Sequence, residues 1–331
     1  MQKTAVITGV NGQDGSYLSE LLLSKSYKVI GLKRRTSTIN TSRVDHLMSN
    51  SDFQLRYYDL QDGPCITHLL NTYRVDELYN LAAQSHVGVS FEIPEYTSYG
   101  ICQGTIKILE AIRSSSPHTK FYQASSSEMY GDSTDYDDNQ AFNEESRMLP
   151  VSPYACSKLH AHHMTRVYRN AYGMHASSGI LFNHESPRRG ETFVTRKITM
   201  AAAKIKLGKQ RKLSLGNLDA QRDWGHAADY VEAMWLMLQQ STGDDYVVAT
   251  NETYTVRDFL KVVFDYAGLG DYNQYVVIDQ RLFRPNEVPF LKGNPAKAIS
   301  RLGWKPKHSM ESLAKSMFDE DLKLLTEKVS I

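Results

Sequence analysis

The sequence is short of the features that mark a secreted or metal-binding protein. It has three cysteines in 331 residues, Cys65, Cys102 and Cys156, and their spacing fits no metal site. An odd number of cysteines without a pairing pattern favours a reduced, cytoplasmic setting. Met1-Gln2-Lys3 leads directly into an apolar run, so we expect no secretory signal peptide.

The sequence also lacks an excess of charge of one sign and long apolar runs. The net charge is +1 at pH 7, so no overall field draws the protein to nucleic acid or to an anionic membrane. No apolar run approaches the roughly 20 residues that span a bilayer. The 41% hydrophobic and 23% charged residues are typical of a globular protein. We therefore expect neither a nucleic-acid nor a membrane partner.

Short apolar runs alternate with helical patterns in the first half of the chain. We expect strands at 5–8, 28–32, 55–58, 77–81 and 120–124, and helices at 17–23, 66–72 and 105–112. This alternation predicts an α/β fold with a Rossmann-like, doubly wound parallel sheet. After about Phe182, polar loops interrupt helices expected at 194–206 and 229–240.

The change of pattern near Phe182 divides the chain into two predicted parts. Residues 1–182 are expected to form a dinucleotide-binding domain. Residues 183–331 are expected to form mainly a smaller, discontinuous substrate-binding domain, with some segments that return to the first domain.

A glycine-rich turn follows the first expected strand and opens the first helix. Gly9, Gly12 and Gly15 have the spacing G-x-x-G-x-x-G. Such glycines allow a tight turn, a close approach of backbone to a pyrophosphate, and close packing of helix on strand. A chance turn is the alternative, but its place between strand and helix favours a dinucleotide loop. Asn11, Gln13 and Asp14 complete this candidate cofactor site.

The end of the second expected strand indicates which dinucleotide is bound. Arg34 and Arg35 precede Thr36-Ser37, at a point where an NAD site usually places an acid. Bases and hydroxyls suit a 2′-phosphate, so NADP is the expected cofactor, although a solvated basic loop is the alternative.

The ends of the third and fourth expected strands complete the cofactor site. Asp59 and Leu60 would lie near the adenine, although Asp59 would serve almost equally well as a helix cap. The small residues around Leu81, Ala83 and Ser85 would let backbone lie against the cofactor.

Tyr154 and Lys158 form the candidate catalytic pair. Pro153 suits a first helical turn, so the two side chains fall one turn apart on one helix face. A phenol is a poor base at neutral pH, and a neighbouring ammonium stabilises the phenolate, which lowers the phenol pKa. Ser126 and Glu128 follow the fifth strand, where active sites of parallel sheets lie. Ser126 would bond the reacting oxygen, and Glu128 adds a carboxylate that simple alcohol oxidation does not need; a loop cap is the alternative for Glu128.

These residues resemble the extended short-chain dehydrogenase/reductase superfamily, and within it the GDP-mannose 4,6-dehydratase family. The similarity runs over nearly the whole chain. Its most specific stretches are 181–190 (LFNHESPRRG), 193–197 (FVTRK) and 222–226 (RDWGH).

The resemblance implies a redox-neutral dehydration of a GDP-sugar. Tyr154 would remove the O4 proton while hydride leaves C4 for NADP. Glu128 would take the C5 proton, water would leave from C6, and hydride would return to C6. It also implies cofactor contacts at Tyr96, Lys158, His184 and Arg189, and nucleotide-sugar contacts at Asn183, Val194, Lys197, Arg222, Arg284 and Glu287.

The charges of the implied sugar site fit a diphosphate. Guanidinium groups such as Arg222 and Arg284 suit its geometry, and Glu287 could accept ribose hydroxyls, with ordinary surface charge as the alternative. The resemblance further implies a homo-oligomer, a dimer or tetramer, with the arginine-rich loop at a tetramer interface.

Two stretches depart from the family pattern. The loop Gly131–Glu145 is acidic and longer than usual, and Met148–Val151 lacks a customary basic residue. Both are expected to flank the sugar pocket, so GDP-manno-heptose is an alternative substrate. A net nucleotide-sugar reductase or epimerase is a second alternative, and a non-catalytic nucleotide sensor is a third.

A histidine-rich segment follows the catalytic pair. His160, His162 and His163 lack partner ligands elsewhere in the sequence, so a polar helix face is expected rather than a metal site.

Overall fold

A seven-stranded parallel sheet is the centre of the computed structural model, which describes residues 2–327. Its strand order is β11-β6-β5-β4-β1-β2-β3, and each neighbouring pair is parallel. The strands are β1 (Thr4–Thr8), β2 (Lys28–Lys33), β3 (Phe53–Tyr57), β4 (Glu77–Asn80), β5 (Lys120–Ser126), β6 (Ala176–Leu181) and β11 (Asp245–Val248). The predicted α/β, Rossmann-like fold class is confirmed.

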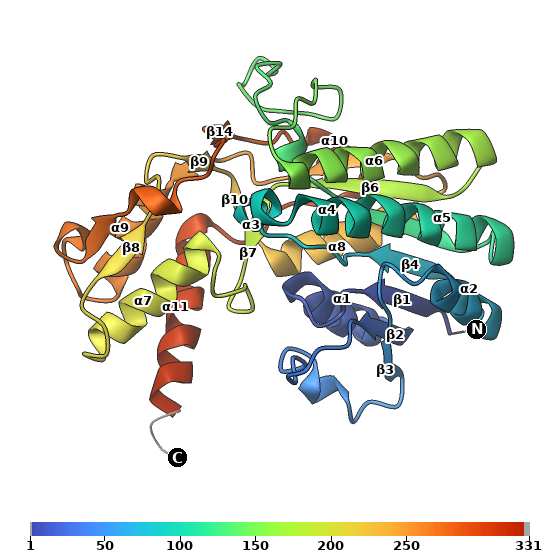
Figure 1. The fold of residues 1–331 in the computed structure, drawn as a ribbon, viewed down its shortest axis with the longest axis horizontal. Helices are drawn as coiled ribbons and strands as arrows, with labels where there is room; N and C mark the ends of the chain where they lie inside the picture. The colour runs from blue at the N-terminus through green and yellow to red at the C-terminus, as the bar shows by residue number, and fades with distance from the viewer. Residues whose placement is uncertain (1, 328–331) are drawn as a thin grey trace.

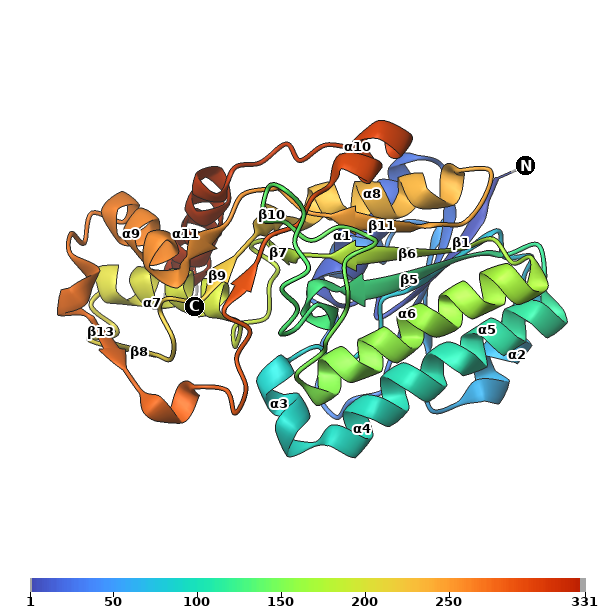
Figure 2. The same cartoon turned by 90° about the horizontal axis from the view of Figure 1, so that it is seen from above.

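Helices cover both faces of this sheet (Figure 2). One face carries α1 (Gln13–Ser24), α8 (Ala227–Gln239) and α10 (Ala296–Leu302), and the other carries α2 (Gly63–Thr72), α5 (Gly104–Ser115) and α6 (Pro153–Tyr172). The alternation of strand side chains decides this layering. In β1, Ala5 and Ile7 belong to the core beneath α1 and α8, whereas Val6 belongs to the core beneath α2 and α5.

Short helical segments connect the layers at the edge where the strands end. After β4 come α3 (Val87–Glu92), α4 (Pro94–Ser98) and a π-helical turn at Tyr99–Gln103 that runs into α5. Single turns of 3₁₀ helix lie at Asp45–Leu47, Ser127–Met129, Tyr272–Gln274 and Gln280–Leu282.

The C-terminal half builds a second, smaller lobe beside the sheet (Figure 1). Its core joins α7 (Val194–Lys206), α9 (Val256–Tyr266) and α11 (Met310–Glu327). Its small sheets pair β8 (Leu213–Leu215) with β13 (Val276–Ile278), and β9 (Gln221–Arg222) with β12 (Tyr254–Thr255) and β14 (Phe290–Leu291). A bridging pair, β7 (Asn183–Glu185) and β10 (Trp224–His226), leads from the main sheet into this lobe.

The chain passes between the two lobes more than once. After β10, helix α8 packs against α1 and β11 extends the main sheet beside β6. Later, α10 packs against α8 and β11 before α11 returns to the second lobe. Segments beyond residue 182 therefore complete one face of the dinucleotide-type sheet.

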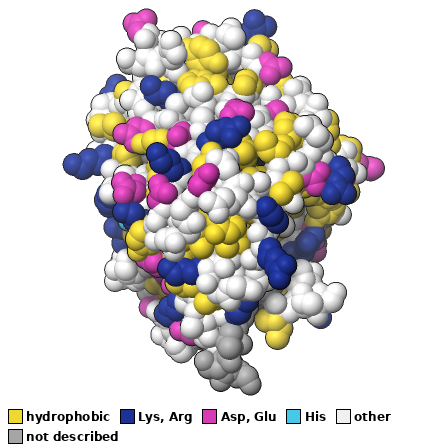
Figure 3. Space-filling model, turned by 90° about the vertical axis from the view of Figure 1, so that its left-hand side faces the viewer, with side chains coloured by type: hydrophobic (Ala, Val, Ile, Leu, Met, Phe, Trp, Pro, Cys, Tyr) yellow, Lys and Arg dark blue, Asp and Glu magenta, His cyan; other side chains and the backbone are white. Residues whose placement is uncertain are grey.

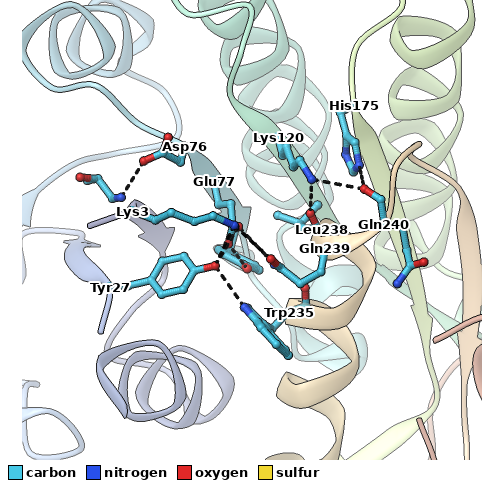
Figure 4. Close-up of polar contacts among 12 residues, drawn as sticks. Lys3, Tyr27, Asp76, Glu77, Lys120, His175, Trp235, Leu238, Gln239 and Gln240 are labelled. Carbon is cyan, nitrogen blue, oxygen red and sulfur yellow. Dashed lines mark hydrogen bonds and ion pairs between the residues drawn. The ribbon is translucent and has the colours of Figure 1, made fainter. Parts of the chain in front are cut away.

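A buried carboxylate fastens the amino edge of the sheet (Figure 4). Glu77, at the start of β4, is 1% exposed and accepts hydrogen bonds from Tyr79 (2.8 Å), Tyr27 (3.0 Å) and Gln239 (3.2 Å). Lys3 Nζ lies 3.1 Å from its Oε1. Because a buried charge is stable only when it is paired and fully hydrogen-bonded, this cluster ties β4 to the end of α8.

The surface carries charges of both signs. On the face in Figure 3, Lys and Arg side chains alternate with Asp and Glu, in keeping with a net charge of +1. Within residues 2–327, no helix has the length and apolar character that crossing a membrane requires.

Candidate active site

A cavity of about 990 Å³ lies at the carboxyl edge of the main sheet and extends to the second lobe. Its walls run from the first turn of the chain to the loop before β14, so both lobes contribute. Open parallel sheets bind ligands at this edge, where loops from successive strands converge.

The turn after β1 is shaped to leave room for a ligand. Gly9 has a φ of +70°, and a Cβ there would lie 3.0 Å from Ala82 Cα. A Cβ on Gly15 would lie 2.5 Å from Gly9 O, so helix α1 starts against the turn itself. Both positions demand glycine, and the backbone they create fits a pyrophosphate at the start of α1.

A partly buried ion pair joins this turn to the second lobe. Asp14 Oδ2 lies 2.8 Å from His184 Nε2 on β7, and His184 Nδ1 contacts Phe182 O at 2.8 Å. Burial opposes both charges, but their mutual attraction prevails, so the pKa of His184 is raised and that of Asp14 is lowered. The pair fixes β7 against the dinucleotide turn.

Helix α6 presents Tyr154 and Lys158 to the cavity. Ser152 caps the helix by accepting from Ala155 N at 3.1 Å, and Pro153 fills the first turn. Lys158 Nζ donates to Ala124 O at 2.7 Å and lies 5.8 Å from the centre of the Tyr154 ring. Both predicted side chains therefore point to the end of β5.

The pKa of the Tyr154 phenol differs from the one that the sequence predicts. Burial raises the pKa of Tyr154 to about 12, although a hydrogen bond with Ser126 and the charge of Arg189 both lower it. Burial also lowers the pKa of Lys158 to about 8. The expected fall of the phenol pKa is thus wrong for the protein without ligands, because desolvation outweighs the hydrogen bond with Ser126 and the charge of Arg189.

Ser126 and Glu128 meet Tyr154 at the end of β5. A 3₁₀ turn, Ser127–Met129, begins there, and Ser126 Oγ accepts from Glu128 N at 3.2 Å. Glu128 is 7% exposed, and its charge raises the pKa of Tyr154 in addition to burial. A hydroxyl, a phenol and a carboxylate thus share one wall of the cavity.

Two arginines and one glutamate face this wall from the second lobe. Arg222 Nη2 lies 2.8 Å from Glu287 Oε1, and Arg284 Nη1 lies 3.4 Å from the same oxygen. Asp223, next to Arg222, is fully buried and accepts from Thr250 N (2.8 Å) and Asn251 N (3.0 Å). This arrangement holds two guanidinium groups at one end of the cavity, a geometry that suits a diphosphate.

The cavity collects almost every residue that the sequence predicts for the site. The lining includes the candidate residues Gly9, Asn11, Gly12, Gln13, Asp14, Gly15, Arg34, Asp59, Leu60, Leu81, Ala83, Ser85, Tyr96, Ser126, Glu128, Tyr154, Lys158, Asn183, His184, Arg189, Val194, Lys197, Arg222, Arg284 and Glu287. Both arginines after β2 are exposed, but Arg34 lines the cavity and hydrogen-bonds Tyr96, whereas Arg35 lies outside the lining. A cofactor contact by Arg35 stays a prediction.

That two atypical stretches flank the sugar pocket stays a prediction. Neither 131–145 nor 148–151 lines the cavity. Phe142 stacks on Tyr130 with ring centres 4.4 Å apart, and Phe142 N donates to Lys292 O at 2.8 Å. The loop is therefore packed on the segment after β14 instead of on the site.

Several supporting residues of the site are not singled out by the sequence. Ser90 Oγ accepts from Tyr154 N at 3.2 Å, and Glu185 Oε2 lies 3.0 Å from Arg189 Nε. His86 and Phe193 pack together in the wall, with ring centres 5.3 Å apart. The Ser90–Tyr154 and His86–Phe193 contacts join distant parts of the chain, so the sequence does not indicate them. Glu185 and Arg189 are four residues apart, and this spacing is the one local pattern among these contacts.

The histidines next to the catalytic pair form no metal centre with other residues in the described range 2–327. His162 Nδ1 contacts Ser125 Oγ at 3.0 Å, and burial lowers its pKa to about 4. It is a buried neutral side chain on the sheet-facing side of α6, so the expected polar helix face holds for the exposed His160 and His163 and not for His162.

A parallel dinucleotide-type sheet with a cavity that joins its carboxyl edge to a small lobe defines the class by its fold: a Rossmann-like α/β fold of the extended short-chain dehydrogenase/reductase type. The dTDP-glucose 4,6-dehydratase of Bacillus anthracis in complex with NAD has this fold (TM-score 0.84, 22% identity, 97% of each chain covered). So has the RMD protein of Pseudomonas aeruginosa complexed with NADPH (TM-score 0.79, 22% identity, 97% of this chain and 100% of that one).

Sequence comparison narrows this class to one family. The model of the family described as GDP-mannose 4,6 dehydratase matches residues 6–317. GDP-mannose 4,6 dehydratase 1 of Arabidopsis thaliana is 53% identical over 98% of this chain and 91% of its own length. The chain belongs to the GDP-mannose 4,6-dehydratase family.

Proposed function

We propose that the protein is an NADP-dependent GDP-mannose 4,6-dehydratase, which converts GDP-mannose to GDP-4-keto-6-deoxymannose with loss of water. The observation that carries this proposal is the meeting of Tyr154, Ser126 and Glu128 on one wall of a cavity, with Arg222 and Arg284 facing that wall from the second lobe. An alcohol dehydrogenase needs the first two side chains only. A buried carboxylate beside them supports a second proton transfer.

Each side chain has a role that its position supports. Tyr154 removes the O4 proton of the sugar, with Ser126 hydrogen-bonded to the same oxygen and Lys158 as the nearby cation. Glu128 takes the C5 proton and delivers a proton to the departing O6 hydroxyl. A nicotinamide held at this wall would supply the acceptor for the C4 hydride and the donor of the same hydride to C6. C5 regains a proton from solvent in that step, so the reaction is redox-neutral and only water is lost. Arg222 and Arg284 hold the diphosphate in this scheme, with Asn183, Val194, Lys197 and Glu287 as further GDP-sugar contacts.

The cofactor site supports a dinucleotide on structural grounds. The spaces beside Gly9 and Gly15 are ones that no larger residue can share, and α1 begins directly behind them. The choice of NADP rests on Arg34, which lines the cavity, and on the absence of an acid at 33–37. We further propose a homo-oligomer, a dimer or tetramer.

GDP-manno-heptose is the less supported sugar. It is suggested by two stretches that depart from the family pattern, and neither of them lines the cavity. A net reductase or epimerase is disfavoured by the buried carboxylate of Glu128, which neither activity requires at that place.

Product analysis tests the proposed function. The purified protein, with catalytic NADP, is incubated with GDP-mannose and separately with GDP-manno-heptose, and product masses are read. We expect loss of one water from GDP-mannose without net consumption of NADPH. Tyr154→Phe serves as the comparison and should lose roughly 10²-fold or more of the rate while it still binds cofactor. Stoichiometric NADPH oxidation, or unchanged GDP-mannose with the folded protein, would refute the proposal.

A further inference from the structure

The loop between β7 and α7 carries Arg189 to the cavity wall. Arg189 lies over the ring of Phe193, with its guanidinium carbon 3.7 Å from the ring centre, and its Nε is 3.0 Å from Glu185 Oε2. Its charge reaches the catalytic phenol, because it lowers the pKa of Tyr154 against the larger effect of burial. The position of this loop therefore matters for both cofactor and Tyr154.

Arginine side chains hold three successive backbone carbonyls of this loop. Arg196 Nη1 donates to Pro187 O, and also to Arg189 O at 3.1 Å. Arg43 Nε donates to the carbonyl between them, that of Arg188, at 2.7 Å. Side-chain anchoring of this kind replaces the regular hydrogen bonds that a loop lacks.

A single residue of the C-terminal helix orients Arg196. Asp321, in α11, is completely buried, and its Oδ1 accepts from Arg196 Nε at 2.6 Å. Its second oxygen accepts from Thr199 Oγ1 at 2.7 Å, so both carboxylate oxygens are bonded to α7. With Nε fixed in this way, the planar guanidinium can present Nη1 only to the loop carbonyls.

We propose that Asp321 is a positioning residue: through Arg196 it holds the loop Ser186–Phe193, and with it Arg189, at the cofactor cavity. The inference rests on the proposed function and on the dinucleotide contact that the family resemblance implies for Arg189, which lines the cavity. A contribution to stability does not by itself explain the Arg196–Asp321 ion pair, because buried ion pairs can often be replaced by apolar residues without loss of stability. Orientation of a loop is a task that an apolar pair cannot perform.

The chain offers matched variants for the test. Asp321→Asn removes the charge but leaves Arg196 as an unpaired buried cation, which risks misfolding. The double variant Arg196→Met with Asp321→Leu fills the same space with apolar side chains, and Thr199 Oγ1 keeps its bond to Arg196 O at 3.2 Å, a backbone atom that the substitution retains. Asp319→Asn is the control on the same helix, because exposed Asp319 bonds only the surface residue Tyr266 at 2.9 Å.

Two readouts separate positioning from stability. The first compares binding of GDP with binding of NADPH or NADH, whichever the wild-type protein binds more tightly. We expect dinucleotide affinity of the double variant to fall roughly tenfold, as for loss of one charged hydrogen bond, with GDP affinity within about twofold of wild type. The second is trypsin cleavage after Arg188 and Arg189 in the protein without ligand, which should become at least about tenfold faster, because a released loop opens more often.

Equal affinities and equal cleavage rates in wild type and a folded double variant would overturn the proposal. So would a loss that is the same for GDP and dinucleotide, or faster cleavage at all sites alike, since either indicates a general structural role. A wild-type protein that binds dinucleotide but does not dehydrate GDP-mannose would refute the proposed function and leave this test valid. The Asp319→Asn control should match wild type in every readout.

Discussion

Arg284 Nη1 lies 3.5 Å from Glu128 Oε1, so a guanidinium that suits the diphosphate also faces the candidate C5 base. The same Nη1 lies 3.4 Å from Glu287, which in turn pairs with Arg222. Binding of the diphosphate end and placement of the carboxylate are thereby linked through one side chain.

Arg284→Gln should affect both binding and turnover. Loss of one charged contact should weaken GDP binding by about 1.5–3 kcal/mol. Because Glu128 also loses its facing cation, kcat should fall together with the affinity, which calorimetry with GDP and steady-state kinetics measure. Arg257→Gln is the control, since Arg257 pairs with Asp219 on the surface. A variant with weaker GDP binding and unchanged kcat would show that Arg284 serves the diphosphate alone.

Lys158 should titrate near physiological pH in the protein without ligands. Burial lowers its pKa to about 8 from an ordinary 10.5, so the ammonium is lost as pH rises through about 8. NMR titration of labelled lysine side chains should show one group with this midpoint, absent in Lys158→Arg. Lys3→Arg is the comparison, because it identifies a lysine whose pKa is shifted in the other direction. Burial lowers the pKa of Lys3, but the neighbouring Glu77 more than offsets this effect, so the pKa is raised. A Lys158 signal that titrates near 10.5 would contradict the account.

The two arginines after β2 should contribute unequally to cofactor choice. Arg34 lines the cavity beside Tyr96, whereas Arg35 lies outside the lining. Arg34→Ala should weaken NADP by roughly tenfold or more and NAD much less, because only NADP has the 2′-phosphate. Arg35→Ala should have the smaller effect in the isolated subunit. Equal losses for NADP and NAD in Arg34→Ala would remove the assignment of NADP.

Glu77 should matter for stability and not for catalysis. Its cluster lies at the edge of the sheet opposite to the cavity, so Glu77→Gln disturbs buried hydrogen bonds far from the site. Leaving buried donors imperfectly paired should cost about 1–3 kcal/mol of unfolding free energy. Denaturant unfolding measures this cost, and KM for GDP-mannose should stay at the wild-type value. A changed KM in a fully folded variant would contradict a purely structural role.

The sequence predicts the parts of the molecule that depend on local spacing. Gly9 to Gly15 and Tyr154 with Lys158 are close in the chain, so strand, turn and helix periodicities place them correctly. Strand β6 and strand β11, which extend the sheet, show no distinct pattern beside the polar segments around them. Their place follows from long-range pairing, which a single sequence does not reveal.

The other features that the sequence does not predict also depend on contacts between residues far apart in the chain or on burial. The acidic loop 131–145 follows Glu128 in the chain, so sequence order alone places it at the pocket, whereas Phe142 stacks on Tyr130 and bonds the segment at Lys292. The Tyr154 pKa depends on how deeply the phenol is buried, which charge spacing does not indicate. The bonds of Asp321 to Arg196 and Thr199 span more than 120 residues and leave no pattern in the sequence.

The fate of the C5 hydrogen tests the central claim most directly. The reaction is run in D₂O with wild-type protein and with Glu128→Gln, and deuterium at C5 of the sugar is followed by NMR. The account predicts deuterium at C5 of the wild-type product and none above background in Glu128→Gln, whose cofactor binding is preserved. Continued incorporation at C5 in that variant would show that another group removes the proton, and the role assigned to Glu128 would be wrong.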